Sequence, residues 1–406
     1  MSTNIHAEQK PLIYQIGIHV KLVDDATFCK SIIADGKELI TGKESGELVV
    51  PELNDEKVYI TFKEDLTSLA NAFSGCSALK YIPENIFANC PEVTDFSYTF
   101  EGCSALESIP EQLFAHNPNV TDFTYTFALC KSLSAIPEKL FAHNPAVTSF
   151  SGTFSSCEAL TTIPENLFAN NPKVIDFGST FEGCSALKSV PENLFANNPE
   201  VTNFYGTFQS CTSLKSIPEN LFANCPAVTD FFFTFSSCSA LESIPEQLFA
   251  NNPKVIDFGA IFSSCTFLKS IPENLFANCP AVTNFGSTFS NCYALATIPE
   301  KLFANCPKVT SFSRTFLACR TLKSVPAGLF DNNRKVTDFG SRFYGLFESC
   351  SALTGESPYT VIDGQKVHLY ERANYPEHFT APSNVQKTFR ECYNLTDYNQ
   401  IPSNWK

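Results

Sequence analysis

The sequence predicts an α/β repeat solenoid, a fold in which coils of similar sequence stack along one axis. A fixed period without insertions, from about residue 66 to residue 339, indicates coils that bury their core against their neighbours. Phenylalanines at the same spacing, such as Phe87, Phe114 and Phe141, would fill that core as stacked aromatic columns. The clearest marker of the period is a cysteine every 27 residues: Cys76, Cys103, Cys130, Cys157, Cys184, Cys211, Cys238, Cys265, Cys292 and Cys319.

The first 65 residues do not carry the repeat and are predicted to form a small β-rich unit, which caps the first coil or docks the protein. An alternating stretch predicts a strand with one apolar face made by Ile16, Ile18, Val20 and Leu22. Turns are predicted at Asp35-Gly36 and Ser45-Gly46, and a further strand at residues 58–62.

Each coil is predicted to hold two extended stretches and one short helix. In the coil after Cys103, residues 106–109 are extended, because the proline that follows biases Ile109 away from helix. Pro110 suits the first position of a helix of one or two turns, and Glu111 complements the positive end of its dipole. Asn117-Pro118 would end the helix, and residues 120–123 are extended again.

After residue 343 the pattern loosens into a degenerate repeat with an inserted hairpin. Alternating runs flank Asp363-Gly364, which is a strong signal for a tight β-turn. We therefore expect residues 344–406 to cap the repeats at 66–343, because a solenoid must cover its open end.

The repeating residues C-x-x-L-x-x-I-P-E-x-L-F-x-x-x-P-x-V-T-D-F-x-x-T-F resemble the BspA-like class of bacterial leucine-rich repeats. The resemblance covers roughly residues 66–406, although the 27-residue length and the many phenylalanines depart from the commonest versions. It implies a leucine-rich-repeat-like, curved solenoid with parallel strands on one face. It also implies adhesion or recognition on the surfaces of gut anaerobes, and similar repeats look to be used by their phages.

Charge and hydropathy exclude several kinds of partner. A net charge of −14 disfavours nucleic acid and anionic lipid, which both require clustered Lys and Arg. No apolar run approaches the roughly 18 residues that would allow membrane insertion. Residues 1–9 are polar and lack the pattern of a secretory signal. Two explanations stay open: the signal has been removed, or the protein reaches its place of work by another route.

The chain has 17 cysteines. Besides the ten periodic cysteines, a second column has Cys in some coils and Asn in the others. We interpret both columns as buried, reduced thiols that act as small hydrophobic groups, with disulfide bridges as the alternative. The second column contains Cys90, Cys225, Cys279 and Cys306, and also Asn117, Asn144, Asn171, Asn198 and Asn252.

No catalytic residue, metal site or cofactor is predicted. A glutamate repeated in nine coils offers no unique carboxylate pair. His116 and His143 share a site in adjacent coils and are interpreted as exposed turn residues, not as metal ligands. A further column of Asp, Asn and Ser is interpreted as hydrogen-bonding to nearby backbone, with calcium binding as the alternative. Its members are Asp95, Asp122, Ser149, Asp176, Asn203, Asp230, Asp257, Asn284, Ser311 and Asp338.

The pair of residues that directly follows the phenylalanine of V-T-D-F varies strongly between coils. The chain is expected to bend at this pair and to expose at least one of its two residues. The large aromatic members are the predicted partner-binding residues, with tolerated variation at partly buried sites as the alternative. These candidates are Tyr98, Tyr125, Tyr205, Phe232 and Phe233.

The function predicted first is a non-catalytic surface recognition or adhesion protein that binds a protein or glycan. Its place would be the cell surface or the extracellular space. The alternatives are a tail-associated, receptor-binding phage virion protein, and an intracellular protein-interaction scaffold in the cytoplasm.

Overall fold

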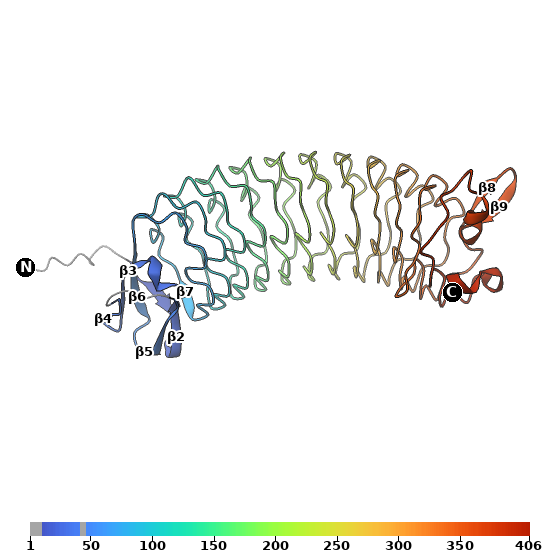
Figure 1. Cartoon of the computed structure of the whole chain (residues 1–406). Coiled ribbons are helices and arrows are strands. Elements are labelled where there is room, and N and C mark those ends of the chain that lie inside the picture. The colour runs from blue at the N-terminus through green and yellow to red at the C-terminus, as the bar shows by residue number, and fades with distance from the viewer. Residues whose placement is uncertain (1–9, 41–45) are drawn as a thin grey trace, which may run out of the picture. The chain divides into compact units, whose positions relative to one another are not determined.

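The computed structural model describes residues 10–40 and 46–406 (Figure 1). The chain forms two compact units, Met1–Leu187 and Lys188–Lys406, and each is described by itself below. The polar stretch at residues 1–9 and Ser45 of the predicted Ser45-Gly46 turn lie outside the described residues. The division at residues 65 and 343 stays a prediction.

The amino-terminal part of the first unit is built from antiparallel strands. One sheet has the order β4-β3-β6-β1-β7, and β2 pairs with β5 in a second sheet. Strand β7 lies in the first cysteine-containing coil and pairs with β1, with Ile13 opposite Tyr81, so the first sheet joins this region to the repeats. The elements are β1 (Leu12–Tyr14), β2 (Gly17–Val23), the 3₁₀ helix η2 (Ala26–Phe28), β3 (Cys29–Ala34), β4 (Lys37–Glu38), β5 (Leu48–Leu53), β6 (Lys57–Phe62) and β7 (Leu79–Tyr81).

The predicted single strand through Ile16 is wrong in part. The extended conformation is interrupted between β1, which ends at Tyr14, and β2, which begins at Gly17. The two strands pair with different partners. Val20 and Leu22 are buried as expected, whereas Ile16 lies outside both strands and is 62% exposed. The alternation does not carry across the break, because a side-chain period of two holds only within one continuous strand. The side chain of Ile18 lies outside the described set.

Within each unit, successive coils are joined by backbone hydrogen bonds and by one parallel bridge per coil. The N–H of Phe100 donates to the carbonyl of Thr126 at 2.8 Å, and that of Phe127 donates to Thr153 at 2.8 Å. The bridges follow the Asp/Asn/Ser column, from Ser68 to Asp176 in the first unit and from Asn203 to Asn384 in the second.

The short helix predicted in each coil is absent, which corrects the α/β assignment. After Pro110 the chain forms turns, in which Leu113 N–H bonds to Pro110 O at 3.3 Å and Asn117 N–H bonds to Phe114 O at 3.1 Å. These bonds span three residues, whereas an α-helix spans four. Coils that are bridged like neighbouring strands lie about 4.8 Å apart. An α-helix about 10 Å wide would force such coils apart.

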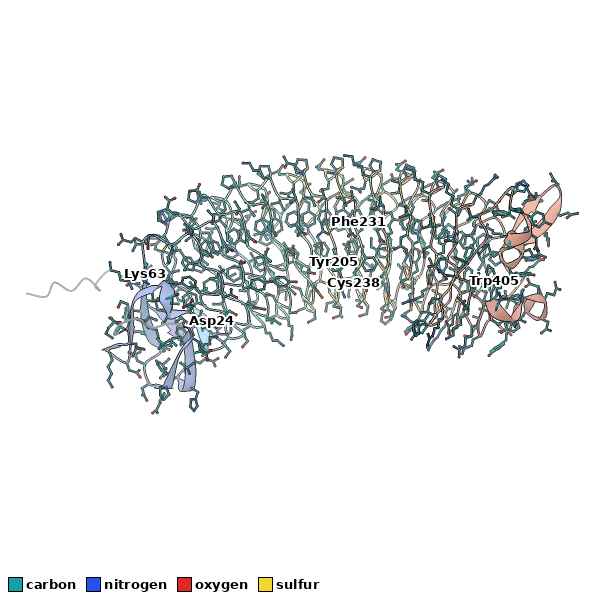
Figure 2. All side chains as sticks on the ribbon, in the orientation of Figure 1. Asp24, Lys63, Tyr205, Phe231, Cys238 and Trp405 are labelled. Carbon is teal, nitrogen blue, oxygen red and sulfur yellow. The ribbon has the colours of Figure 1, made fainter. Side chains whose placement is uncertain are left out.

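Stacked phenylalanine rings form the largest side-chain columns of the core, beside buried Leu, Ile, Val and Cys, which confirms the predicted aromatic columns. Phe100 and Phe127 stack at a centroid distance of 5.4 Å with planes 5° apart, and Phe231 and Phe258 stack at 5.8 Å. Figure 2 shows Phe231 and Cys238 among the side chains of the second unit. Each ring removes its own area and that of its neighbours from water, so the ladder stabilises every coil through the next.

Both cysteine columns are buried as predicted, and within the described residues none of the 17 cysteines forms a disulfide. The thiol of Cys130 lies 3.3 Å from the carbonyl oxygen of Phe100, one coil earlier. Burial raises the pKa of Cys184 and of Cys238 to about 12. At the Asn positions, Asn144 Nδ2 donates to Phe114 O at 3.1 Å and to Asn117 O at 2.8 Å.

The carboxyl-terminal residues of the second unit contain the predicted hairpin. Strands β8 (Tyr359–Ile362) and β9 (Gln365–His368) pair antiparallel. Asp363 and Gly364 between them have φ values of 49° and 79°, as a tight I′ turn requires. Three 3₁₀ helices follow: η3 (Leu369–Asn374), η4 (Tyr398–Gln400) and η5 (Ser403–Trp405).

Arg372 of η3 donates hydrogen bonds to the backbone carbonyls at the end of the Asn column in the second unit. Its Nη1 donates to Asn333 O at 3.1 Å and its Nη2 donates to Phe330 O at 2.9 Å. These carbonyls occupy the coil positions whose equivalents bond to Asn144 one coil later. The guanidinium of Arg372 therefore supplies the hydrogen bonds that an Asn side chain of a following coil would donate.

Candidate recognition face

The Asp/Asn/Ser column shapes the backbone beside the variable pairs, which confirms its predicted structural role. Asp122 Oδ1 accepts the N–H of Thr124 at 2.7 Å, and Asp230 Oδ1 accepts the N–H of Phe232 at 2.7 Å. Asn284 Oδ1 does the same for Gly286 at 2.8 Å. Each bond holds the first residue of a variable pair in a local turn. Among residues 10–40 and 46–406, no group of three or more His, Cys, Asp or Glu could hold a metal ion.

The second residue of nearly every pair lies in the left-handed region, so the chain bends there as predicted. Such a residue interrupts the alternation of a strand. The expected exposure is wrong for two pairs, Gly178-Ser179 and Gly259-Ala260, in which both residues are buried. A non-glycine residue in this region costs roughly 1–2 kcal/mol. The φ values are 57° at Tyr98, 53° at Tyr125, 61° at Gly152, 53° at Ser179, 58° at Gly206, 61° at Phe233, 52° at Ala260, 61° at Ser287 and 61° at Arg314.

In the first unit, the structure brings Tyr98 and Tyr125 together. Their rings stack at 5.2 Å with planes 11° apart. The other side of Tyr125 lies against Gly152, where a Cβ would come within 2.4 Å of the ring. Both side chains are half-buried. Each ring face of Tyr125 is covered by a neighbouring coil, one face by Tyr98 and the other by Gly152.

In the second unit, the other three predicted residues form one cluster. Tyr205 stacks on Phe232 at 5.9 Å, and Phe233 meets Phe232 edge-on at 4.3 Å. Phe232 also lies over Gly259, where a Cβ would come within 2.5 Å of its ring. Tyr205 is 41% exposed, whereas Phe232 and Phe233 are half-buried.

A groove of about 690 Å³ begins at Phe232 and Phe233 and runs across the following coils to Tyr344. It exists because the variable pairs of these coils are mostly small, as at Ala260 and Gly286. Its lining residues are Phe232, Phe233, Ala260, Ser263, Asn284, Gly286, Ser287, Ser290, Asn291, Ser313, Arg314, Leu317, Asp338, Ser341 and Tyr344.

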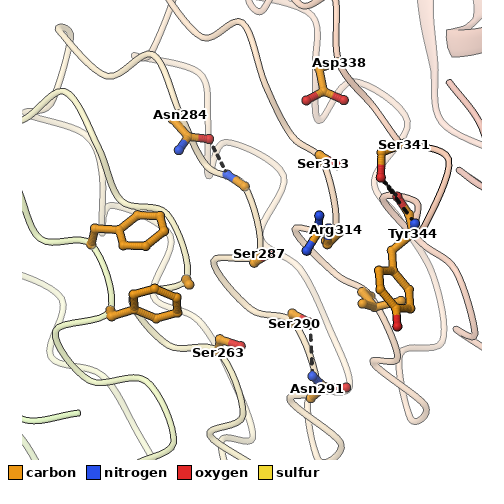
Figure 3. Close-up of a pocket in the computed structure, with 15 residues that line it drawn as sticks. Ser263, Asn284, Ser287, Ser290, Asn291, Ser313, Arg314, Asp338, Ser341 and Tyr344 are labelled. Atoms are coloured by element: carbon orange, nitrogen blue, oxygen red, sulfur yellow. Dashed lines mark hydrogen bonds between the residues drawn. The ribbon is translucent and has the colours of Figure 1, made fainter. Parts of the chain in front are cut away.

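Arg314 and Tyr344 are groove residues that the sequence reasoning missed. Figure 3 shows Arg314 between Ser287 and Tyr344. The guanidinium carbon lies 5.4 Å from the centroid of the Tyr344 ring, and within the described residues this side chain forms no ion pair. The available signal was the run of small pair residues between Phe233 and Tyr344, with one large cation inside it.

Asp338 is the groove's carboxylate. Ser311 Oγ donates to its Oδ2 at 2.9 Å. Burial raises the pKa of Asp338, and the Ser311 bond, the backbone N–H of Gly340 and the positive charge of Arg314 together oppose that shift only in part.

The sequence also matches a family model, the BspA type leucine rich repeat region, in six copies over residues 78–337 and 215–396. The chain belongs to the BspA-type leucine-rich repeat family. This confirms the resemblance seen in the sequence. Proteins of this family are generally non-catalytic and typically surface-associated, and leucine-rich repeat proteins generally bind proteins.

Solved structures that this BspA-type chain resembles include two bacterial leucine-rich repeat proteins. A leucine-rich repeat protein from Bacteroides ovatus is 20% identical, with a TM-score of 0.43, covering 93% of this chain and 96% of that one. A leucine rich cell surface protein from Faecalibacterium prausnitzii is 17% identical, with a TM-score of 0.22, covering 77% and 96%. No curated protein matches the chain. Among the described residues, no helix has the length and apolar character needed to cross a bilayer.

Proposed function

We propose that this BspA-type repeat protein is a non-catalytic recognition protein of the cell surface or extracellular space, and that its ligand lies in the groove between Phe233 and Tyr344. The observation that carries the proposal is the groove itself. Its volume of about 690 Å³ falls within the range of small-ligand and side-chain binding sites.

The lining supports binding and not catalysis. A covalent or acid–base mechanism needs a nucleophile with a base beside it, or two carboxyl groups in different environments. The groove is lined by serines, asparagines and aromatic rings, with Arg314 and Asp338 as its charged residues. The five lining serines therefore have no histidine, lysine or glutamate next to them in the lining.

The aromatic cluster of Tyr205, Phe232 and Phe233 would form the anchoring wall. Rigid aromatic side chains contribute large contact areas at low entropic cost, and they dominate many recognition surfaces. The stack in the first unit is a weaker candidate, because both faces of the Tyr125 ring are already covered.

The test is a substitution that fills the groove without disturbing the coil. Ser313→Tyr places a large ring at the first pair position, where Tyr205 and Phe232 already stand in other coils. Ser97→Tyr is the matched control, because it makes the same change at the same coil position outside the groove. The purified chain and both variants are applied to a glycan array and to a displayed peptide library.

We expect the wild-type protein and Ser97→Tyr to retain the same ligands, and Ser313→Tyr to lose them. If the wild-type protein retains no ligand, or if Ser313→Tyr retains the same ligands with equal affinity, the groove is not the recognition site.

A further inference from the structure

We infer that the ligand of this groove is a glycan, a short oligosaccharide, and not a peptide. The inference rests on the proposed function and names the chemical class of its ligand. It is carried by the composition of the lining, by the positions of its rings and by the state of Arg314.

The lining is rich in groups that can both donate and accept hydrogen bonds. Five serines and two asparagines line the groove, against three aromatic rings and one leucine. Hydroxyl and amide groups match sugar hydroxyls, which also donate and accept. The energetic centres of protein interfaces are instead poor in serine and rich in large apolar side chains. A peptide would therefore find few pockets here for its own side chains.

The rings stand at the two ends of the groove and leave its middle polar. Phe232 and Phe233 close one end, and Tyr344, which is 47% exposed, stands at the other. The ends are about four coil steps apart, or about 20 Å at a spacing of about 4.8 Å. A pyranose presents C–H groups on one face, and these pack against the electron-rich face or the edge of an aromatic ring. A short chain of sugars can therefore contact both ends while its hydroxyls meet the serines between them.

Arg314 supplies a fixed donor near the Tyr344 end of the groove. Its guanidinium has five N–H donors and no acceptor, and it is engaged by the Tyr344 ring without an ion pair among the described residues. A planar fork of donors can bind two adjacent sugar oxygens at once, as it does with carboxylates. Asp338 lies in the same lining as an acceptor, so vicinal hydroxyls can be read by a donor and an acceptor together.

The experiment compares ligand classes directly and then removes the donor. The wild-type protein is applied to a glycan array and to a displayed peptide library under the same detection. Arg314→Ser is the test variant, since Ser179 and Ser287 occupy the equivalent left-handed position in other coils. Arg320→Ser is the control, because Arg320 lies over Tyr293, outside the groove lining.

We expect oligosaccharides to be retained, with affinity lowered about tenfold or more by Arg314→Ser, as fits the loss of charge-assisted bonds, and unchanged by Arg320→Ser. Retention of peptides alone, lost in Ser313→Tyr, would overturn the glycan assignment and leave the proposed function standing. Glycan binding that survives Ser313→Tyr would overturn both, as would the retention of neither class. Glycan binding blocked by Ser313→Tyr but insensitive to Arg314→Ser would refute the role of the arginine.

Discussion

The ring of Tyr125 lies directly on the backbone of Gly152, one coil later, so that a Cβ at Gly152 would come within 2.4 Å of Tyr125 Cε1. Phe232 and Gly259 repeat this relationship in the second unit, with a corresponding distance of 2.5 Å to Cε2. At these two places an aromatic residue in one coil packs on a glycine in the next, and the ring leaves no room there for a side chain.

Gly152→Ala is expected to destabilise the protein by about 2 kcal/mol, because it adds a clash with Tyr125 to the strain of a left-handed backbone. In a Tyr125→Ala background the same substitution should cost only about 1 kcal/mol, which is the backbone strain alone. Denaturant titration of the four proteins gives the coupling energy. Gly102→Ala is the control, since its φ is 70° and its Cβ would meet no atom closer than 3.5 Å. Equal costs in both backgrounds would show that the ring does not rest on Gly152.

Asp122→Ala is expected to lower the free energy of unfolding by about 1 kcal/mol, since the N–H of Thr124 loses its acceptor. Asp122→Asn should be close to neutral, because Asn203 and Asn284 make the equivalent bond to Tyr205 and Gly286. Urea denaturation of the two variants compares them. Equal losses for Asn and Ala would mean that the charge matters, and not the hydrogen bond.

Arg372→Met is expected to cost about 2 kcal/mol, because it leaves the carbonyls of Phe330 and Asn333 without their donors in a buried site. Burial lowers the pKa of this arginine to about 9, so part of the loss is offset by removing a buried charge. Amide hydrogen exchange should become faster in the last coils than in the other coils. Arg334→Met, at an exposed neighbouring position, is the control and should leave exchange unchanged.

Stability is expected to fall steeply at alkaline pH. Burial raises the pKa of Cys184, Cys238 and Cys292 to about 12, whereas thiols of an unfolded chain ionise near 8.5. The unfolded chain therefore loses protons first as the pH rises. The contribution of these thiols is complete below pH of about 8.5 and is lost as the pH approaches 12, at up to about 1.4 kcal/mol per pH unit for each thiol.

The urea midpoint measured between neutral pH and pH of about 11 tests this expectation, with thiolate absorbance as a second signal that should appear together with unfolding. Replacing Cys238 and Cys265 by Ala should make the decline shallower, because two fewer thiols titrate. A midpoint that does not change with pH across this interval would show that the cysteine columns are accessible to ionisation in the folded state.

The period, the phenylalanine ladders, the burial of the cysteines and the bend at the variable pairs could all be predicted from the sequence. Each depends on residues that recur at a fixed spacing, so one coil serves as a control for another. The helices after residues such as Pro110 were predicted wrongly, because the local signals of proline and glutamate do not include the spacing between coils. Ile16 was wrongly assigned to the buried face of a strand, because alternation alone does not show where a strand ends.

The sequence by itself determined that this chain is a BspA-type stack of coils with an aromatic core and with a backbone bend at the variable pairs. Only the tertiary structure decided where those pairs leave a groove, and that Arg314 lies beside Tyr344 within it. The reason is physical: the core repeats the same contact in every coil, whereas the groove depends on the sizes of different side chains placed next to one another by stacking.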